Sequence, residues 1–114
     1  YNSYHHIKPT KPLRADTIAE GIAVKNPGKL TLPLINKFVD DIVTVTEEEI
    51  ASSILYMLER NKTLMEGAGA AALAALFAHN DYIKSRHCGV IVSGGNFDID
   101  KIPLIQQLAN KHTA

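Results

Sequence analysis

The sequence predicts an α/β fold in which parallel strands carry helices on both faces, with this chain forming only part of the domain. Short β-branched runs at 41–45 and 90–92 predict strands, and the second run has no polar alternation, as expected of a buried parallel strand. The stretch 66–78 is apolar on every face beyond its first residue, so it needs packing partners on all sides. Two strands and three other helices are too few to surround it, which indicates an incomplete domain.

The composition restricts the possible partners and compartment. The chain has 114 residues, of which 46% are hydrophobic and 21% charged, as is typical of one soluble globular unit. Twelve basic and 12 acidic side chains give zero formal net charge, so nothing favours nucleic acid or an anionic membrane as a partner. The single cysteine, Cys88, cannot form an internal disulfide. No apolar run could span a membrane, and the polar start lacks the apolar centre of a signal peptide. We therefore expect a cytoplasmic protein.

The opening of the chain is predicted to be irregular. Residues 1–14 are polar, contain two prolines and show neither helical nor strand periodicity, which predicts an extended polar segment ahead of a second portion, 15–114. His5 and His6 are adjacent, and adjacent side chains seldom converge on one metal ion. We expect both histidines to be solvated.

The next elements follow from changes in periodicity. Residues 17–24 fit either a strand or a short helical turn, and Pro27-Gly28 then predicts a tight turn. From 30 to 39 apolar residues recur at helical spacing, with Pro33 tolerated in the first turn. A short helix is therefore expected over 30–39.

A second helix is predicted from Thr46 to about Asn61. The Thr46 hydroxyl can accept from the Glu49 amide while the Glu49 carboxylate accepts from the Thr46 amide, which makes a capping box. The acidic run 47–49 could instead hold a metal, but capping and the positive end of the helix dipole explain it without a ligand. We predict no metal site in this chain.

The stretch from Cys88 to Asp98 is the candidate functional region. Its β-branched run ends in Ser93-Gly94-Gly95-Asn96, and ligands of open α/β sheets bind outside the carboxyl ends of strands. Two adjacent glycines let the backbone pass close to a ligand, with Ser93 presenting a hydroxyl at the floor of a pocket. An ordinary strand-to-helix turn explains the glycines equally well. A last helix is predicted over 98–112.

Four short motifs together resemble the C-terminal part of the catalytic domain of threonine dehydratases (threonine ammonia-lyases) and the closely similar serine racemases. They are Thr17-Ile18-Ala19-Glu20-Gly21, the run from Phe38 to Ile50, Glu66-Gly67-Ala68-Gly69-Ala70 and Ser93-Gly94-Gly95-Asn96. These families are fold-type II pyridoxal-phosphate enzymes, related to the tryptophan synthase β subunit. The resemblance covers about Lys8 to Asp100 and implies that 15–114 is the C-terminal portion of such a domain.

The resemblance implies a binding site for pyridoxal 5′-phosphate. Ser93 matches the family serine that hydrogen-bonds the pyridine nitrogen, and a hydroxyl partner leaves the ring a shallower electron sink than a carboxylate does. The residues 94–96 are implied to shape the turn beside the ring, and Gly21 matches a glycine on the substrate side. Glu66 matches a glutamate near the active site, although stabilisation of the helix start is an equally good explanation.

The implied reaction of the complete enzyme is a β-elimination. L-Threonine or L-serine would be deaminated to 2-oxobutanoate or pyruvate with release of ammonia. The resemblance also implies a homo-oligomer that acts on a small amino acid, in threonine catabolism or isoleucine biosynthesis.

The chain departs from the family at the catalytic centre. The family's Schiff-base lysine lies in a Ser-x-Lys-x-Arg-Gly motif, and none of the nine lysines here has those neighbours. The glycine-rich loop that holds the cofactor phosphate is also missing from the sequence. We predict no catalytic residue in this chain and no activity for the chain alone, which would need the remainder of the catalytic domain.

Two hypotheses from other classes remain open on the sequence. The chain could be a stand-alone module that offers the turn at 93–96 to an anion or small amino acid, or its apolar helix to a partner chain. It could also be a truncated gene product without activity. The choices between threonine and serine, and between dehydration and racemisation, depend on residues that the chain does not contain.

Overall fold

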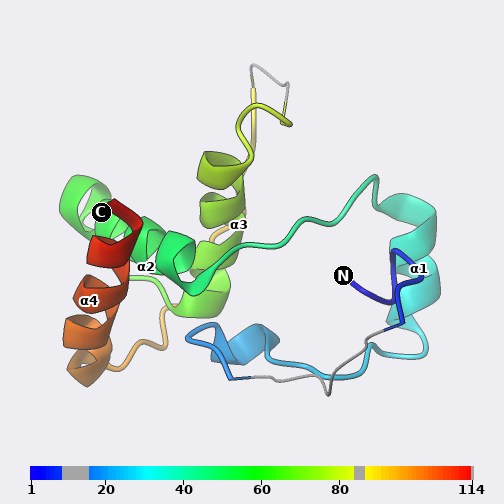
Figure 1. Ribbon diagram of the computed structural model, residues 1–114, viewed down its shortest axis with the longest axis horizontal. Helices are drawn as coiled ribbons and strands as arrows, with labels where there is room; N and C mark the ends of the chain where they lie inside the picture. The colour runs from blue at the N-terminus through cyan, green and yellow to red at the C-terminus, as the bar shows by residue number, and fades with distance from the viewer. Residues whose placement is uncertain (9–15, 84–86, 114) are drawn as a thin grey trace.

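The computed structural model describes residues 1–8, 16–83 and 87–113. In Figure 1 most of the helices gather at one end of the molecule, and α1 (Thr31–Phe38) lies at the other. The helical elements of the described residues are, in chain order, η1 (Glu20–Ile22), α1 (Thr31–Phe38), α2 (Glu47–Tyr56), η2 (Met57–Asn61), α3 (Gly67–Ala78), η3 (Ile99–Lys101) and α4 (Ile102–Thr113). No helix among these residues is long and apolar enough to cross a membrane.

Helix α2 is the centre of the packed part, because both α3 and α4 lie against it. Its start confirms the predicted capping box: the Glu49 amide donates to the Thr46 hydroxyl over 3.2 Å, and the Thr46 amide donates to the Glu49 carboxylate over 2.8 Å. The predicted helical stretch up to Asn61 is also confirmed, as α2 continues into the π-helical turn η2. Lys62 then ends it in the left-handed conformation, with a φ of 56°.

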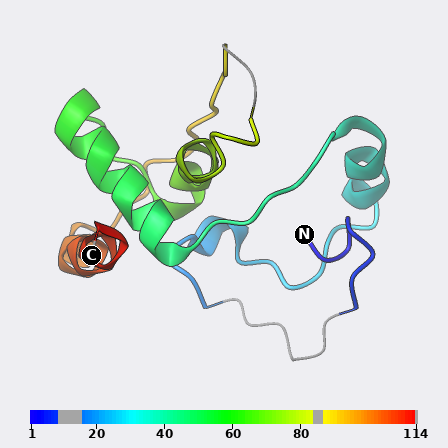
Figure 2. The same cartoon turned by 45° about the horizontal axis from the view of Figure 1, so that its top comes forward.

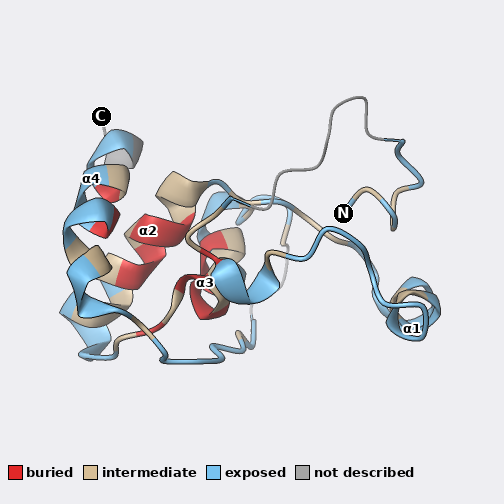
Figure 3. Ribbon diagram, turned by 90° about the horizontal axis from the view of Figure 1, so that it is seen from below, coloured by how far each residue is buried: buried red, intermediate tan, exposed pale blue. Residues whose placement is uncertain are grey.

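The hydrophobic core lies between α2, α3 and α4, as Figure 3 shows by colour. Ile54 from α2 and Ile105 from α4 are almost completely buried, at 1% and 2% exposure. Full burial of side chains of this size contributes about 1.5–3 kcal/mol each. The buried hydrophobic residues are Ala19, Ile50, Ala51, Ile54, Met65, Ala70, Leu73, Ala74, Ile105 and Ala109.

Helix α3 forms where the all-apolar helix is predicted, but the described residues cover only one side of it. Gly67, Gly69 and Ala70 are buried towards the rest of the chain, whereas Ala72 is exposed and Phe77 is 49% exposed. This uneven cover agrees with the expectation that the helix belongs to a larger domain.

The predicted strands at 41–45 and 90–92 do not form: no described residue is in a strand. Both segments are irregular, and the second is not buried, since Ile91 is 82% exposed. A strand needs the ladder hydrogen bonds of a neighbour, and neither segment finds them among the described residues. Side chains instead bond the carbonyl oxygens of 41–45: the Nε2 of His79 lies 2.9 Å from the Thr44 oxygen, and that of His5 lies 3.1 Å from the Ile42 oxygen.

Helix α1 confirms the predicted short helix, but it stands apart from the core. In Figures 1 and 2 alike it lies on the opposite side of the molecule from α4. It has no buried residue, and Leu34 and Phe38 on its apolar face are 56% and 68% exposed. Among the described residues no other helix packs against α1, although Leu32 and Ile35 are half-buried and line a pocket together with the opening residues 1–4.

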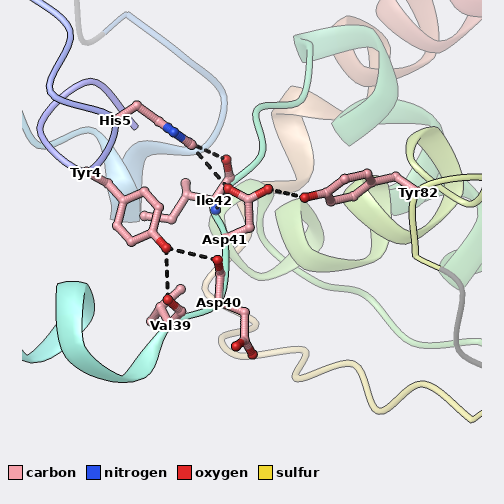
Figure 4. Close-up of polar contacts among 7 residues, drawn as sticks. All are labelled: Tyr4, His5, Val39, Asp40, Asp41, Ile42 and Tyr82. Atoms are coloured by element: carbon pink, nitrogen blue, oxygen red, sulfur yellow. Dashed lines mark hydrogen bonds and ion pairs between the residues drawn. The ribbon is translucent and has the colours of Figure 1, made fainter.

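The opening segment is described over 1–8, and the remainder of the predicted extended segment 1–14 lies outside the described residues. The described part bends back, since the His5 amide donates to the Tyr1 carbonyl over 3.0 Å. Figure 4 shows its two anchors: the Tyr4 hydroxyl donates to the carbonyl of Val39 over 2.9 Å, and the His5 ring lies 3.4 Å from the Asp41 carboxylate.

Asp41 joins this segment to the loop after α3, because its carboxylate also accepts from the Tyr82 hydroxyl. That hydrogen bond, with a second from the Ile42 amide and the nearby His5, lowers the pKa of Asp41 below its ordinary value. A lowered pKa means that the contact stabilises the fold above pH about 4 and that this stabilisation is lost as the pH falls through the folded-state pKa.

Replacing Tyr82 by phenylalanine should therefore raise the pKa of Asp41 towards that of an ordinary aspartate. The variant should be less stable than the parent at neutral pH, and the difference should vanish in acid, where both carry a protonated Asp41. NMR titration of the carboxyl carbon measures the pKa, and unfolding at pH 7 and at successively lower pH, down through the folded-state pKa of the parent, measures the stability. Tyr56→Phe is the control, because its ring packs on Phe77 at 5.1 Å, away from Asp41. An unchanged pKa of Asp41 in Tyr82→Phe would contradict the prediction.

Candidate functional site

Three segments that are distant in sequence meet at the N-terminus of α3 and enclose a small cleft. They are η1 with its flanks, the start of α3 and the stretch that leads from the Ser-Gly-Gly-Asn turn into α4. The cleft is lined by Ile18, Glu20, Gly21, Ile54, Glu66, Gly67, Ala68, Asn96, Phe97, Asp98, Lys101 and Ile105. Three of the residues predicted from the sequence, Gly21, Glu66 and Asn96, are therefore brought to one place.

The segment that carries Gly21 is held by the acidic start of α2. The carboxylate of Glu47 accepts from the Thr17 hydroxyl and, over 2.7 Å, from the Ile18 amide. The acidic run 47–49 thus has two roles, since Glu49 caps its own helix and Glu47 fixes a distant backbone. Within the described residues no group of three or more His, Cys, Asp or Glu side chains could hold a metal ion.

Two glycines at the start of α3 let other backbones touch the helix. A Cβ on Gly67 would lie 2.2 Å from the Ile18 carbonyl oxygen, and one on Gly69 would lie 2.0 Å from the Ser93 carbonyl oxygen. No side chain fits at either distance, so glycine is required at both positions. The helix start therefore fixes two distant backbones, at Ile18 through Gly67 and at Ser93 through Gly69.

Glu66 lies between the segment that carries Gly21 and the turn that carries Gly94. Its amide donates to the Gly94 carbonyl over 3.3 Å, and its side chain caps no helix amide. The carboxylate faces the glycines instead: Oε1 lies 2.2 Å from where a Cβ of Gly94 would stand and 3.7 Å from that of Gly21. The structure thus favours a role of Glu66 inside the cleft over helix capping by its side chain.

The turn itself adjoins the cleft. Gly94 has a φ of +83°, a conformation that side-chain-bearing residues rarely adopt, whereas a Cβ on Gly95 would meet the Leu64 carbonyl oxygen at an ordinary 3.6 Å. Ser93 is exposed beside the cleft and does not line it, contrary to the predicted position at a pocket floor. Asn96, the last residue of the motif, does line the cleft.

Charged residues at the rim of the cleft were not expected from the sequence. The Nζ of Lys101 lies 2.6 Å from Oε1 of Glu20, and this contact raises the pKa of Lys101 and keeps its amine protonated. Lys101 is the one basic residue among the described residues that line the cleft, which also has three carboxylates, Glu20, Glu66 and Asp98. No local motif signals a contact between residues 81 positions apart, so only the tertiary structure reveals it.

The cleft is too small to hold a cofactor and a substrate by itself. Its volume is about 50 Å³, whereas small-molecule pockets occupy about 300 Å³ or more. The described residues provide polar groups and glycine backbone on one side only. What they can do chemically is support one face of a flat ligand, with Asn96 and the carboxylate of Glu66 as its polar contacts.

The chain is similar to known proteins over most of its length. A family model described as "Pyridoxal-phosphate dependent enzyme" matches residues 1–94. An L-threonine ammonia-lyase of Thermotoga maritima is 46% identical over 95 residues, which are 83% of this chain and 23% of that protein.

Two solved structures have the same fold over most of the chain. The processed form of threonine deaminase isoform 2 from Solanum lycopersicum superposes with a TM-score of 0.76 at 28% identity, over 84% of this chain and 27% of that one. Serine racemase from Dictyostelium discoideum superposes with a TM-score of 0.70 at 31% identity, over 86% of this chain and 31% of that one. The chain thus spans about a quarter to a third of the length of these proteins.

Proposed function

Because the chain belongs to the pyridoxal-phosphate-dependent enzyme family, we propose that it is a portion of an L-threonine or L-serine dehydratase that deaminates its substrate by β-elimination. One observation carries the proposal. Gly21, Glu66 and Asn96 come from three separate segments and line the same cleft, with the remainder of the Ser-Gly-Gly-Asn turn beside it. An unrelated turn would have no reason to meet the other two segments there.

The residues present fit one face of pyridoxal phosphate. At Gly21 a Cβ would point to within 3.0 Å of the Ala68 side chain and 3.7 Å of the Glu66 carboxylate, so glycine keeps the cleft open at this point. Ser93 is exposed beside it with a hydroxyl that can donate to a ring nitrogen. We propose that 93–96 holds the pyridine edge and that Gly21 lies on the substrate side.

The cofactor and the residues of this chain would have different roles in the reaction. The bound cofactor supplies the electron sink for removal of the α proton and loss of the β-hydroxyl group. Ser93 is a neutral partner for the ring nitrogen, so it does not force that nitrogen to stay protonated as a carboxylate would. Asn96 and Glu66 orient the face of the ring, and the tight contacts of Gly67 and Gly69 hold both supporting segments in place. The Schiff-base lysine and the phosphate loop would come from the remainder of the catalytic domain.

The complete domain would also supply what the described elements lack. We propose that 15–114 is its C-terminal portion and that 41–45 and 90–92 become parallel strands once neighbouring strands provide ladder partners. The exposed apolar side of α3 would then be covered. We further propose a cytoplasmic homo-oligomer; the exposed, unbridged Cys88 suits a reducing compartment.

The proposal is tested by expressing the complete protein and the 114-residue chain side by side. The complete protein should bind pyridoxal phosphate, seen as a visible absorbance band that survives dialysis, and should convert threonine to 2-oxobutanoate or serine to pyruvate. The isolated chain should show neither the band nor turnover, because it has no lysine in the family setting. A stable band and threonine turnover from the isolated chain would contradict this assignment.

Serine racemisation is the second candidate, and the similarity to the Dictyostelium discoideum serine racemase favours it. Formation of D-serine from L-serine without a 2-oxo acid would select this alternative. If the complete protein binds no pyridoxal phosphate at all, a small-ligand or partner-binding module becomes the better hypothesis.

A further inference from the structure

An ion pair between Lys101 and Glu20 lies at the rim of the cleft. The two residues are 81 positions apart, and their charged atoms are 2.6 Å from each other. Glu20 directly precedes Gly21, and Lys101 ends η3, which follows the Ser-Gly-Gly-Asn turn. The pair therefore joins the two segments that would support the same face of a flat cofactor.

Both residues belong to hydrogen-bonded turns. The distance between their side chains is therefore coupled to the distance between the two turns. On one side the Ala23 amide donates to the Glu20 carbonyl over 3.1 Å. On the other side the Lys101 amide donates to the Asp98 carbonyl over 3.0 Å, and the Asp98 carboxylate accepts from the Asp100 amide over 3.0 Å. Because these hydrogen bonds hold each turn together, we expect each turn to move as one unit.

The start of α3 and the rim of the cleft are held by different contacts. At the start of α3, Gly67 and Gly69 place the helix against the backbones of Ile18 and Ser93, which leaves no space for adjustment. At the rim the side chains are 40% and 72% exposed, for Lys101 and Glu20 respectively. Exposed ion pairs add little to global stability, so the effect of this pair should be confined to the spacing across the cleft.

We propose that Lys101 and Glu20 are a positioning pair that sets the separation between Gly21 and the turn 93–96, and thereby the affinity for the cofactor. The inference rests on the proposed function, because it assigns the pair to the same cofactor site. Neither residue takes part in proton transfer. Their role is to keep the two supporting segments at the spacing that the ring requires.

A double-mutant cycle in the complete protein tests the pair. Lys101→Met and Glu20→Gln each remove one charge at similar side-chain length, and the double variant removes both. In the apoprotein, hydrogen exchange of the amides at 93–98 should be about 2- to 5-fold faster in each single variant, and the dissociation constant for pyridoxal phosphate should rise by about the same factor. The double variant should be no worse than either single variant, because both remove the same interaction.

Two further measurements separate positioning from a general structural role. The exchanged pair, Glu20→Lys with Lys101→Glu, should restore most of the affinity, and about 1 M salt should shrink the difference between parent and single variants, because it screens exposed charges. Lys111→Met on α4 is the matched control; it removes the same charge outside the cleft and should change neither quantity. The midpoint of thermal unfolding should stay nearly unchanged in all these variants.

The possible results test the positioning pair and the proposed function separately. Additive effects of the two single variants, or no effect on exchange and affinity, would overturn the positioning pair while leaving the proposed function intact. An effect of Glu20→Gln alone would mean that Glu20 has another partner, which also overturns it. Failure of the parent protein to bind pyridoxal phosphate would instead refute the proposed function. The hydrogen-exchange data on the apoprotein would still report whether the ion pair couples the segment at Gly21 to the turn 93–96.

Discussion

Replacing Gly69 by alanine is expected to cause the largest loss in this protein. The new Cβ would lie 2.0 Å from the carbonyl oxygen of Ser93. Because that neighbour is backbone, the whole turn must move away from α3, and overpacking of this kind costs about 1–3 kcal/mol of the free energy of unfolding. If Ser93 holds the cofactor as proposed, its displacement would misplace the pyridine ring, and a shift of about 1 Å at a reacting centre can lower the rate on the order of 10²-fold.

The measurement compares denaturant unfolding, pyridoxal-phosphate affinity and the rate of 2-oxobutanoate formation in the complete protein. Gly89→Ala is the matched control, because no atom lies within 4 Å of its added Cβ and its φ is not positive. The same chemical change there should leave all three quantities near those of the parent. Parent-like affinity and rate in Gly69→Ala would show that the turn does not depend on close contact with α3.

Replacing Gly94 by alanine is expected to have the second largest effect, for two separable reasons. Its φ of +83° is unfavourable for any residue with a Cβ, at a cost of about 1–2 kcal/mol. The Cβ would also lie 2.2 Å from Oε1 of Glu66. Since that neighbour is the end of a flexible side chain, it can move aside, but it then leaves its place in the cleft. Cofactor affinity should therefore fall by about tenfold or more, as about 1.4 kcal/mol corresponds to a factor of ten.

The neighbouring glycine provides the control for this second prediction. A Cβ on Gly95 would meet only the carbonyl oxygen of Leu64, at an ordinary 3.6 Å, and its φ is not positive. Gly95→Ala should thus be much milder than Gly94→Ala. Adding Glu66→Ala to Gly94→Ala should relieve the overlap and leave only the backbone cost to stability, without restoring cofactor affinity, because the Glu66 carboxylate is itself part of the proposed site. Equal effects at the two glycines would contradict the geometry of the turn.

The helices were predictable because their signals are local. Thr46 and Glu49 are three residues apart, and the capping box that they form marks the start of α2 whatever surrounds it. The uniformly apolar run 67–78 likewise predicted both the helix and its need for cover beyond this chain. Family resemblance, carried by short motifs in register, predicted that Gly21, Glu66 and the Ser-Gly-Gly-Asn turn belong together.

The strands were not predictable from β-branched residues alone. The runs 41–45 and 90–92 have the composition of strands, yet neither finds a ladder partner among the described residues. Strand formation depends on a neighbouring backbone, and sequence propensity cannot supply one. The exposure of Ser93 beside the cleft was likewise not predictable, because it depends on which segments pack around the turn.

By itself, the sequence determined the helices, the family and the residues that gather at the start of α3, because each depends on neighbours in the chain or on motifs of a few residues. Only the tertiary structure showed that Glu47 holds the Ile18 amide and that Lys101 meets Glu20 across the cleft. It also showed that Gly69 is pressed against Ser93. These contacts join residues far apart in the chain, and such residues come together only when the packing of α2, α3 and α4 brings their segments to one place.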